Sequence, residues 1–232
     1  MNSRHTTSAS PENHTPIDSN WGREAYPQSL VALNPPPLAY DTYGYVTPEC
    51  AEQLFRFHPE VVLYCPEIPQ NTGSISRLCA AMSSPLHLIE PMKFEITEKK
   101  VRRAGLDYWE HVRLATHPSW DAFIKTRINR RFIFVETGGT QSPASFSFEP
   151  GDVLIFGGET AGIPRAIMEQ TQCCANTELV TIPMFNRGVR SLNLANTVSI
   201  VLYAAIAQLH ENGAPSENIT HTRHSTSSNI LR

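Results

Sequence analysis

The sequence predicts an α/β protein, built on a mostly parallel β-sheet with helices on both faces. Short apolar runs such as Val61–Tyr64 and Val153–Phe156 are typical of strands buried on both sides. Segments with helical patterns alternate with these runs along the chain. Glycine- and proline-rich loops follow several of the runs, and ligands of parallel sheets bind at the carboxyl ends of strands.

The elements are expected in a simple order. A helix is expected to begin at Thr47-Pro48-Glu49, where a capping residue precedes a proline at the first helical position. Residues 66–70 are expected to be loop, and Asn71-Thr72-Gly73 to open the next helix. The remaining expectations are strands at 61–64, 86–89, 132–135, 153–156 and 179–183, and helices at 99–105, 120–124, 164–170 and 192–209.

The composition changes at both ends of the chain. Residues 1–40 are rich in Ser, Thr, Asn, Pro and His, and such a segment cannot bury enough apolar surface to offset the entropy of ordering. Residues 1–57 are therefore interpreted as an extension, largely flexible, with a possible short helix at 48–57. Residues 58–213 are expected to form one domain, and 214–232 a polar tail.

Bulk composition excludes several classes of protein. The net charge is −3, so contact with nucleic acid would need a local basic patch, and Lys99, Lys100, Arg102 and Arg103 provide a candidate. Five cysteines without a C-x-x-C pair indicate reduced thiols in a cytoplasmic protein, with neither a disulfide framework nor a metal site. No apolar run approaches the roughly 18 residues of a membrane span, so no membrane association is expected.

Three loops that follow expected strands have unusual contents. The first is PEIPQNTG at 66–73, with Arg77 in the helix that follows. The second is GGETAGIP at 157–164, which matches neither G-x-G-x-x-G nor a P-loop. Its carboxylate, Glu159, would repel a phosphate, so pyrophosphate is not the expected ligand. The third runs from Ile182 through RSLNLAN at 190–196.

In this order, the three loops resemble the signature motifs of the SPOUT methyltransferases, in the branch that methylates ribose 2′-oxygens of RNA. The stretches LYCPEIPQNTGSISRLCA, HLIEPM and RRAGLDYWEHV are similar to those of the small members that act on cytidine or uridine 34 of tRNA. The resemblance covers roughly residues 60–212. It implies a C-terminal trefoil knot, S-adenosylmethionine as cofactor, tRNA as partner and a homodimer.

The resemblance also implies roles for individual residues. Those expected at the cofactor are Val135, Gly157, Glu159, Gly162, Ile182, Ser191 and Leu192. Those expected at the reacting ribose are Arg77, Asn71, Ser191, Asn193 and Tyr203. Because a guanidinium stays protonated, Arg77 is expected to hold a phosphate and stabilise the developing alkoxide instead of acting as a base.

Each residue also has an ordinary structural interpretation. Asn71 and Ser191 would serve as helix N-caps, and Arg77 as a solvated helix residue. Tyr203 would belong to the core or to a dimer interface. The basic run at 99–103 would be a solvated face.

The chain departs from the family pattern in the second and third loops. Gly158 and Ala161 replace a Pro and an Arg, a Lys is missing near Glu136, and the loop 185–189 is longer. Arg187 in that loop is expected to replace a lost RNA contact. The wobble nucleotide 34 is the leading target. Another tRNA position, ribosomal RNA, a non-catalytic RNA-binding module and a flavodoxin-like nucleotide binder are the alternatives.

Overall fold

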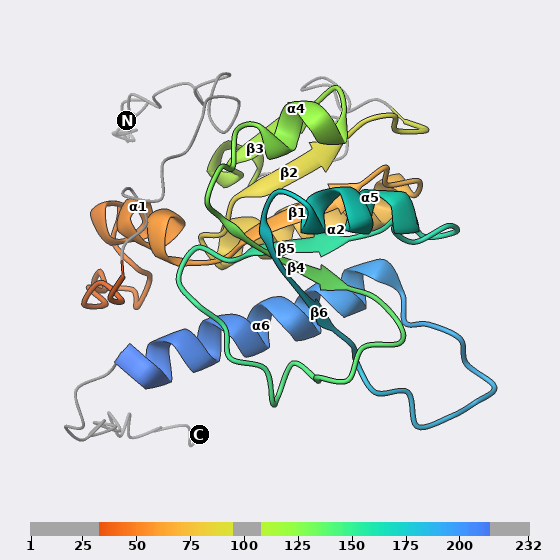
Figure 1. Cartoon of the computed structure of the whole chain (residues 1–232). Coiled ribbons are helices and arrows are strands. Elements are labelled where there is room, and N and C mark those ends of the chain that lie inside the picture. Colours follow the sequence, from red (N-terminus) through yellow and green to blue (C-terminus); the bar gives the residue numbers. More distant parts are fainter. Residues whose placement is uncertain (1–32, 95–107, 214–232) are drawn as a thin grey trace, which may run out of the picture.

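The computed structural model describes residues 33–94 and 108–213 (Figure 1). The expected basic helix at 99–105, with Lys99, Lys100, Arg102 and Arg103, lies outside the described residues, as do most of the extension and the tail. Among the described residues, no helix is long and apolar enough to cross a membrane.

The centre of the fold is a six-stranded sheet in which every pair of neighbours is parallel. The strand order is β3-β2-β1-β5-β4-β6. The strands are β1 (Glu60–Tyr64), β2 (Leu86–Ile89), β3 (Leu114–His117), β4 (Arg131–Val135), β5 (Val153–Phe156) and β6 (Asn176–Val180). The predicted parallel α/β fold is thus confirmed.

Helices cover both faces of the sheet, as expected. On one face, alternate strand residues such as Val61 and Leu63 pack with α2 (Pro69–Ala81) and α6 (Leu194–Gly213). On the other, Val62 and its equivalents pack with α4 (Trp120–Ile124) and α5 (Arg165–Gln172). Figure 1 shows α6 and α4 on opposite sides of the sheet. Among the described residues, two further helices form: α1 (Pro48–Phe57) and a 3₁₀ helix, η2 (Trp109–His111).

The first helix forms as its sequence predicts. Thr47 is the N-cap of α1, and its hydroxyl accepts a hydrogen bond from the backbone N–H of Cys50 at 3.4 Å. Cys50, Leu54 and Phe57 are buried. Part of the N-terminal extension is therefore packed against the body of the protein.

Three expectations need correction. Helix α2 begins at Pro69, two residues before Asn71, so the loop that precedes it is shorter than expected. The last strand, β6, ends at Val180 instead of extending to Pro183. A strand that was not expected, β3, forms one edge of the sheet.

A buried cluster of charges fixes the amino end of the sheet. The carboxylate of Glu60 contacts Arg127 at 2.6 Å, Arg130 at 2.9 Å and His87 at 2.9 Å. Burial by itself would raise the pKa of Glu60, but the two guanidinium groups and His87 overcome it and hold the pKa well below its usual range. The cluster therefore carries a carboxylate that stays ionised in the interior.

A pair of histidines joins the end of α1 to the end of α6. The Nδ1 atom of His58 lies 2.7 Å from the carbonyl oxygen of Met82, and its Nε2 atom lies 2.8 Å from Nε2 of His210. Burial lowers the pKa of His58 to about 4, with His210 adding to the effect. This contact is formed by neutral imidazoles.

Candidate active site

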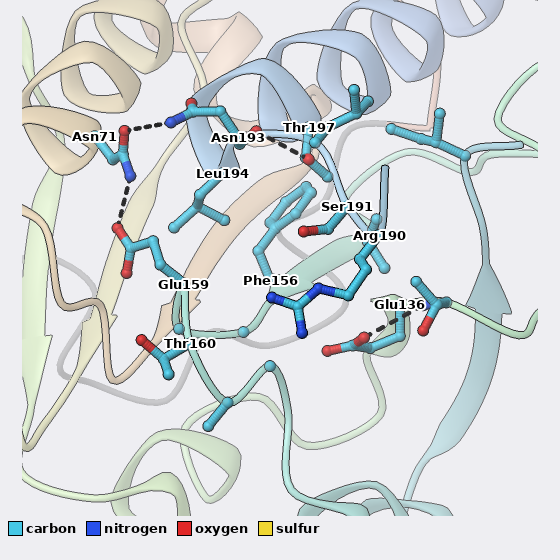
Figure 2. A pocket seen from close by; sticks show the side chains of 18 of the residues that line it. Asn71, Glu136, Phe156, Glu159, Thr160, Arg190, Ser191, Asn193, Leu194 and Thr197 are labelled. Carbon is cyan, nitrogen blue, oxygen red and sulfur yellow. Dashed lines mark hydrogen bonds between the residues drawn. The ribbon is translucent and has the colours of Figure 1, made fainter. Parts of the chain in front are cut away.

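A cavity of about 580 Å³ opens at the carboxyl ends of neighbouring strands β4, β5 and β6. This volume is typical of sites for small molecules. Its walls come from the three loops identified in the sequence, together with the end of β4 and the start of α6 (Figure 2). The apolar part of the wall includes Val135, Phe156, Ile182, Leu192 and Leu194.

Hydrogen bonds between side chains tie the three loops to one another. Asn71 donates from Nδ2 to Glu159 at 2.8 Å, and its Oδ1 accepts from Nδ2 of Asn193 at 2.9 Å. In Figure 2 these three side chains lie together on one side of the cavity. The chain of contacts links the start of α2, the loop after β5 and the start of α6.

Glu159 also holds the start of helix α2. Its carboxylate accepts hydrogen bonds from the backbone N–H groups of Glu67 at 2.8 Å and Ile68 at 3.2 Å. A negative charge near a helix N-terminus is favourable because the N–H groups there lack partners within the helix. Ile68, at the cap position, supplies no side-chain cap, and the distant carboxylate of Glu159 instead binds the N–H groups of the two residues that precede α2.

Glu67 completes the connection in the opposite direction. Its carboxylate accepts from both the backbone N–H and the hydroxyl of Thr160, each at 3.1 Å, and it also pairs with Lys93. The hydrogen bond with Lys93, followed by those with Thr160, lowers the pKa of Glu67. The loops after β1 and β5 are therefore joined by two carboxylates, and each accepts a hydrogen bond from the backbone of the other loop.

Two glycines allow the loop after β5 to close on itself. A Cβ atom at Gly157 would lie 2.2 Å from the backbone carbon of Gly162, which is far inside a normal contact. Gly162 has a φ of +65°, and a Cβ there would meet a carboxylate oxygen of Glu136 at 2.5 Å. Gly157 is thus required by the loop's own backbone, a more immediate reason than the expected close approach to a ligand.

Glu136 and Arg190 bring opposite charges to the other side of the cavity. The carboxylate of Glu136 accepts from the backbone N–H of Ile163 at 2.8 Å, so it is fixed by the loop after β5. Figure 2 shows the guanidinium of Arg190 pointing into the cavity between Ser191 and Glu136. An amphoteric ligand that carries both a cation and a carboxylate would find partners here.

All seven residues expected at the cofactor line this cavity. Of those expected at the ribose, Asn71, Ser191 and Asn193 line it as well. Asn193, not Ser191, caps α6, because its Oδ1 accepts from the backbone N–H of Ala195 at 2.9 Å.

Arg77 and Tyr203 are not among the residues that line the cavity. The guanidinium of Arg77 lies over the ring of Tyr108, 4.7 Å from its centroid, and Arg77 is exposed. Tyr203 is 64% exposed on α6. Arg187 is exposed in the loop that follows β6.

Residues 58–203 match the SpoU rRNA Methylase family, which is more than half of the chain. The chain belongs to this family. A tRNA (cytidine(34)-2'-O)-methyltransferase of Saccharophagus degradans is 45% identical over 149 residues, which span 64% of this chain and 94% of the relative.

Solved structures agree with this assignment to the SpoU family. One, from work on the 2-OH methylation of C/U34 on tRNA, is 42% identical with a TM-score of 0.57, covering 67% of this chain and 98% of its own. The SpoU methyltransferase AviRb from Streptomyces viridochromogenes, in complex with AdoMet, is 26% identical with a TM-score of 0.53. That match covers 66% of this chain and 57% of AviRb.

Several residues of this SpoU-family site were given no role by the sequence. Glu67, Glu136, Thr160 and Arg190 are the most prominent. Glu136 could have been predicted as a site residue, since it directly follows a buried strand at the edge where parallel sheets bind ligands. Among the described residues, no cluster of three or more His, Cys, Asp or Glu side chains is arranged to hold a metal.

Proposed function

We propose that the protein is an S-adenosylmethionine-dependent methyltransferase that modifies the ribose 2′-oxygen of nucleotide 34, cytidine or uridine, in tRNA. The observation that carries the proposal is the cavity at the ends of β4, β5 and β6, fixed by three interlocked loops in a SpoU-family chain. The named activity of the 45% identical relative supports nucleotide 34 as the target.

The side chains around the cavity suit S-adenosylmethionine. The apolar wall suits the adenine ring, and Ile182 and Leu192, which line the cavity, would offer it their main-chain groups. Arg190 is placed to hold the carboxylate of the methionine moiety, and Glu136 can accept hydrogen bonds from its ammonium or from the ribose. The loop after β5, held by Glu136 and Glu159, keeps this arrangement in place before binding.

The reaction requires alignment and charge stabilisation more than activation. When bound, S-adenosylmethionine would supply an electrophilic methyl group for the 2′-oxygen and be left as a neutral thioether, and the hydroxyl proton would pass to water or to a phosphate of the substrate. Arg77, which is exposed and lies over the ring of Tyr108, would hold a phosphate of the substrate outside the cavity and offset developing negative charge. Both polar ends of the Asn193 side chain are engaged by Asn71 and by the backbone, so its role is to position the loops.

The assembly, the knot and the cellular location complete the proposal. Ile200 and Tyr203, one helical turn apart on α6, are 44% and 64% exposed, which supports a homodimer formed through this helix. The C-terminal trefoil knot and a cytoplasmic location are proposed from the family resemblance. The dimer would explain why an apolar helix keeps an exposed face.

Mass spectrometry of nucleosides after incubation with tRNA and S-adenosylmethionine tests the function. We expect one 2′-O-methylated nucleotide, at position 34. tRNA with 2′-deoxyribose at that position alone should accept no methyl group. Methylation of the deoxy substrate would move the target elsewhere in tRNA, and methylation of ribosomal RNA alone would refute the tRNA assignment.

A further inference from the structure

The loop between β6 and α6 projects from the rim of the cavity. Met184 and Arg190 both line the cavity, so both ends of the projecting segment, residues 185–189, are fixed in its wall. Phe185 is 99% exposed, more than any other large apolar side chain of the described part of the chain. Because consecutive Cα atoms are about 3.8 Å apart, the backbone of Phe185 lies next to the wall of the cavity.

The projecting segment has a defined shape. The side-chain oxygen of Asn186 accepts a hydrogen bond from the backbone N–H of Gly188 at 2.8 Å. The backbone carbonyl oxygen of Asn186 accepts a second one from the backbone N–H of Val189 at 3.2 Å. These contacts form a turn of the kind that asparagine favours. The turn presents Phe185 and the exposed Arg187 to solvent instead of folding them onto the protein.

The charges of the loop indicate which kind of molecule it binds. Residues 183–193 contain Arg187 and Arg190 and no acidic residue. An exposed aromatic ring two residues from Arg187, with no acidic residue in the loop, suits the bases and phosphates of an unpaired nucleic acid strand. Single-stranded RNA is commonly recognised by stacking of splayed bases on aromatic side chains.

We propose that the loop 184–190 is the docking element for the unpaired strand of the RNA substrate. Phe185 stacks on a base adjacent to the modified nucleotide, and Arg187 contacts a phosphate of the same strand. This inference rests on the proposed function and specifies how the substrate is held at that site. Stacking is available to every base, so this contact supplies affinity and orientation without selecting a sequence.

The proposal is tested with an anticodon stem-loop RNA that carries 2-aminopurine on either side of nucleotide 34. Stacking on Phe185 should quench the fluorescence of one of the two probes when wild-type protein binds. Phe185→Ala should abolish this quenching and weaken RNA binding by about 5- to 150-fold, the range that stacking of one base provides. Phe185→Trp should retain both quenching and affinity.

Matched variants separate docking from general effects. Arg187→Gln should weaken binding and make it less dependent on salt, since one phosphate contact is lost. Ile128→Ala and Arg56→Gln change an exposed apolar and an exposed basic residue away from the loop, and both should bind RNA like the wild type. S-adenosylmethionine affinity, measured by calorimetry, should be the same for all of these variants.

Three other outcomes would contradict either the docking proposal or the proposed function. If wild-type protein methylates the stem-loop but Phe185→Ala binds it equally well, the docking proposal is wrong. If Phe185→Ala turns a dimer into a monomer in sedimentation, the ring belongs to an interface between copies, and the proposal is equally wrong. If wild-type protein binds S-adenosylmethionine but neither binds nor methylates the RNA, the proposed function itself fails.

Discussion

Glu67 and Glu159 each bind the backbone of the loop that carries the other. The carboxylate of Glu159 accepts from the N–H of Glu67, and the carboxylate of Glu67 accepts from the N–H of Thr160, next to Glu159. The two loops are therefore fixed to one another without direct contact between the two negative charges. This arrangement sets the shape of the cavity before any ligand arrives.

Glu159→Gln should weaken binding of S-adenosylmethionine by about tenfold or more. The NH₂ of the glutamine amide would face N–H donors that now bind the two carboxylate oxygens of Glu159. A donor left without an acceptor costs about 1–3 kcal/mol. Isothermal titration calorimetry measures the effect. Glu169→Gln changes an exposed glutamate of α5 and should leave affinity unchanged. Wild-type affinity in Glu159→Gln would show that the loops hold their shape without this contact.

Gly157→Val should abolish binding of S-adenosylmethionine and lower the melting temperature. The added Cβ would lie 2.2 Å from the backbone at Gly162, so the loop after β5 must open. Calorimetry and thermal unfolding measure the two effects. Gly73→Ala is the matched control, because a Cβ at that helical position meets nothing within 4 Å. Normal binding by Gly157→Val would mean that the ligand lies elsewhere.

Arg77→Ala should leave affinity for S-adenosylmethionine unchanged, because Arg77 does not line the cavity. Turnover on tRNA should fall by about 10² or more, comparable to the loss of one oxyanion donor. Arg77→Lys should restore little activity, since an ammonium cannot replace a bidentate guanidinium on a phosphate. The rate of methyl transfer to tRNA is measured in single-turnover experiments. Full activity of Arg77→Ala would reduce Arg77 to a structural residue of α2.

Ile200→Glu should convert the proposed homodimer into a monomer, because a carboxylate would be buried without a partner in the interface. Ile128→Glu, at a residue that is 65% exposed, should not change the assembly. Sedimentation velocity at micromolar concentration distinguishes the two states. Wild-type protein that sediments as a monomer would refute the dimer.

The free energy of unfolding should fall as the pH drops from about 6.5 toward 4. His58 has a folded pKa of about 4 and an ordinary value of 6.5, so in this window the unfolded chain binds a proton that the folded chain does not. Burial also lowers the pKa of His87 to about 4, and it contributes in the same sense. Urea unfolding of wild type and His58→Gln at pH 7, 6 and 5 should show a smaller loss for the variant. An equal loss in both proteins would assign the effect to other groups.

The sequence predicted the central strands well and the edge strands poorly. β1 and β5 lie inside the sheet and are continuous apolar runs, so composition alone identifies them. β3 and β6 are the two edge strands, and their residues alternate in burial or remain partly exposed. A search for apolar runs therefore missed β3 and placed β6 three residues too late.

The sequence placed the three loops at the cavity but predicted only part of its lining and none of the hydrogen bonds that connect the loops. The three loops were correctly expected to gather at one edge of a parallel sheet. Pro69 at the first helical position was a signal for the early start of α2, whereas the hydrogen bonds from the two preceding residues to Glu159, about 90 positions further along the chain, could not be predicted. The cap of α6 was assigned to Ser191 and not to Asn193 for a similar reason, since either side chain suits the position until the backbone is known.

The strand order has a consequence for the synthesis of the protein. The cavity draws on residues from Ile68 to Thr197, and β1 must pair with β5 before the loops that follow them can meet. Such contacts between distant parts of a chain form slowly, and a nascent chain gains them only after the last contributing segment has left the ribosome. Ligand binding can therefore stabilise only a polypeptide that extends at least to Thr197, and shorter nascent chains gain no such protection from aggregation and proteolysis.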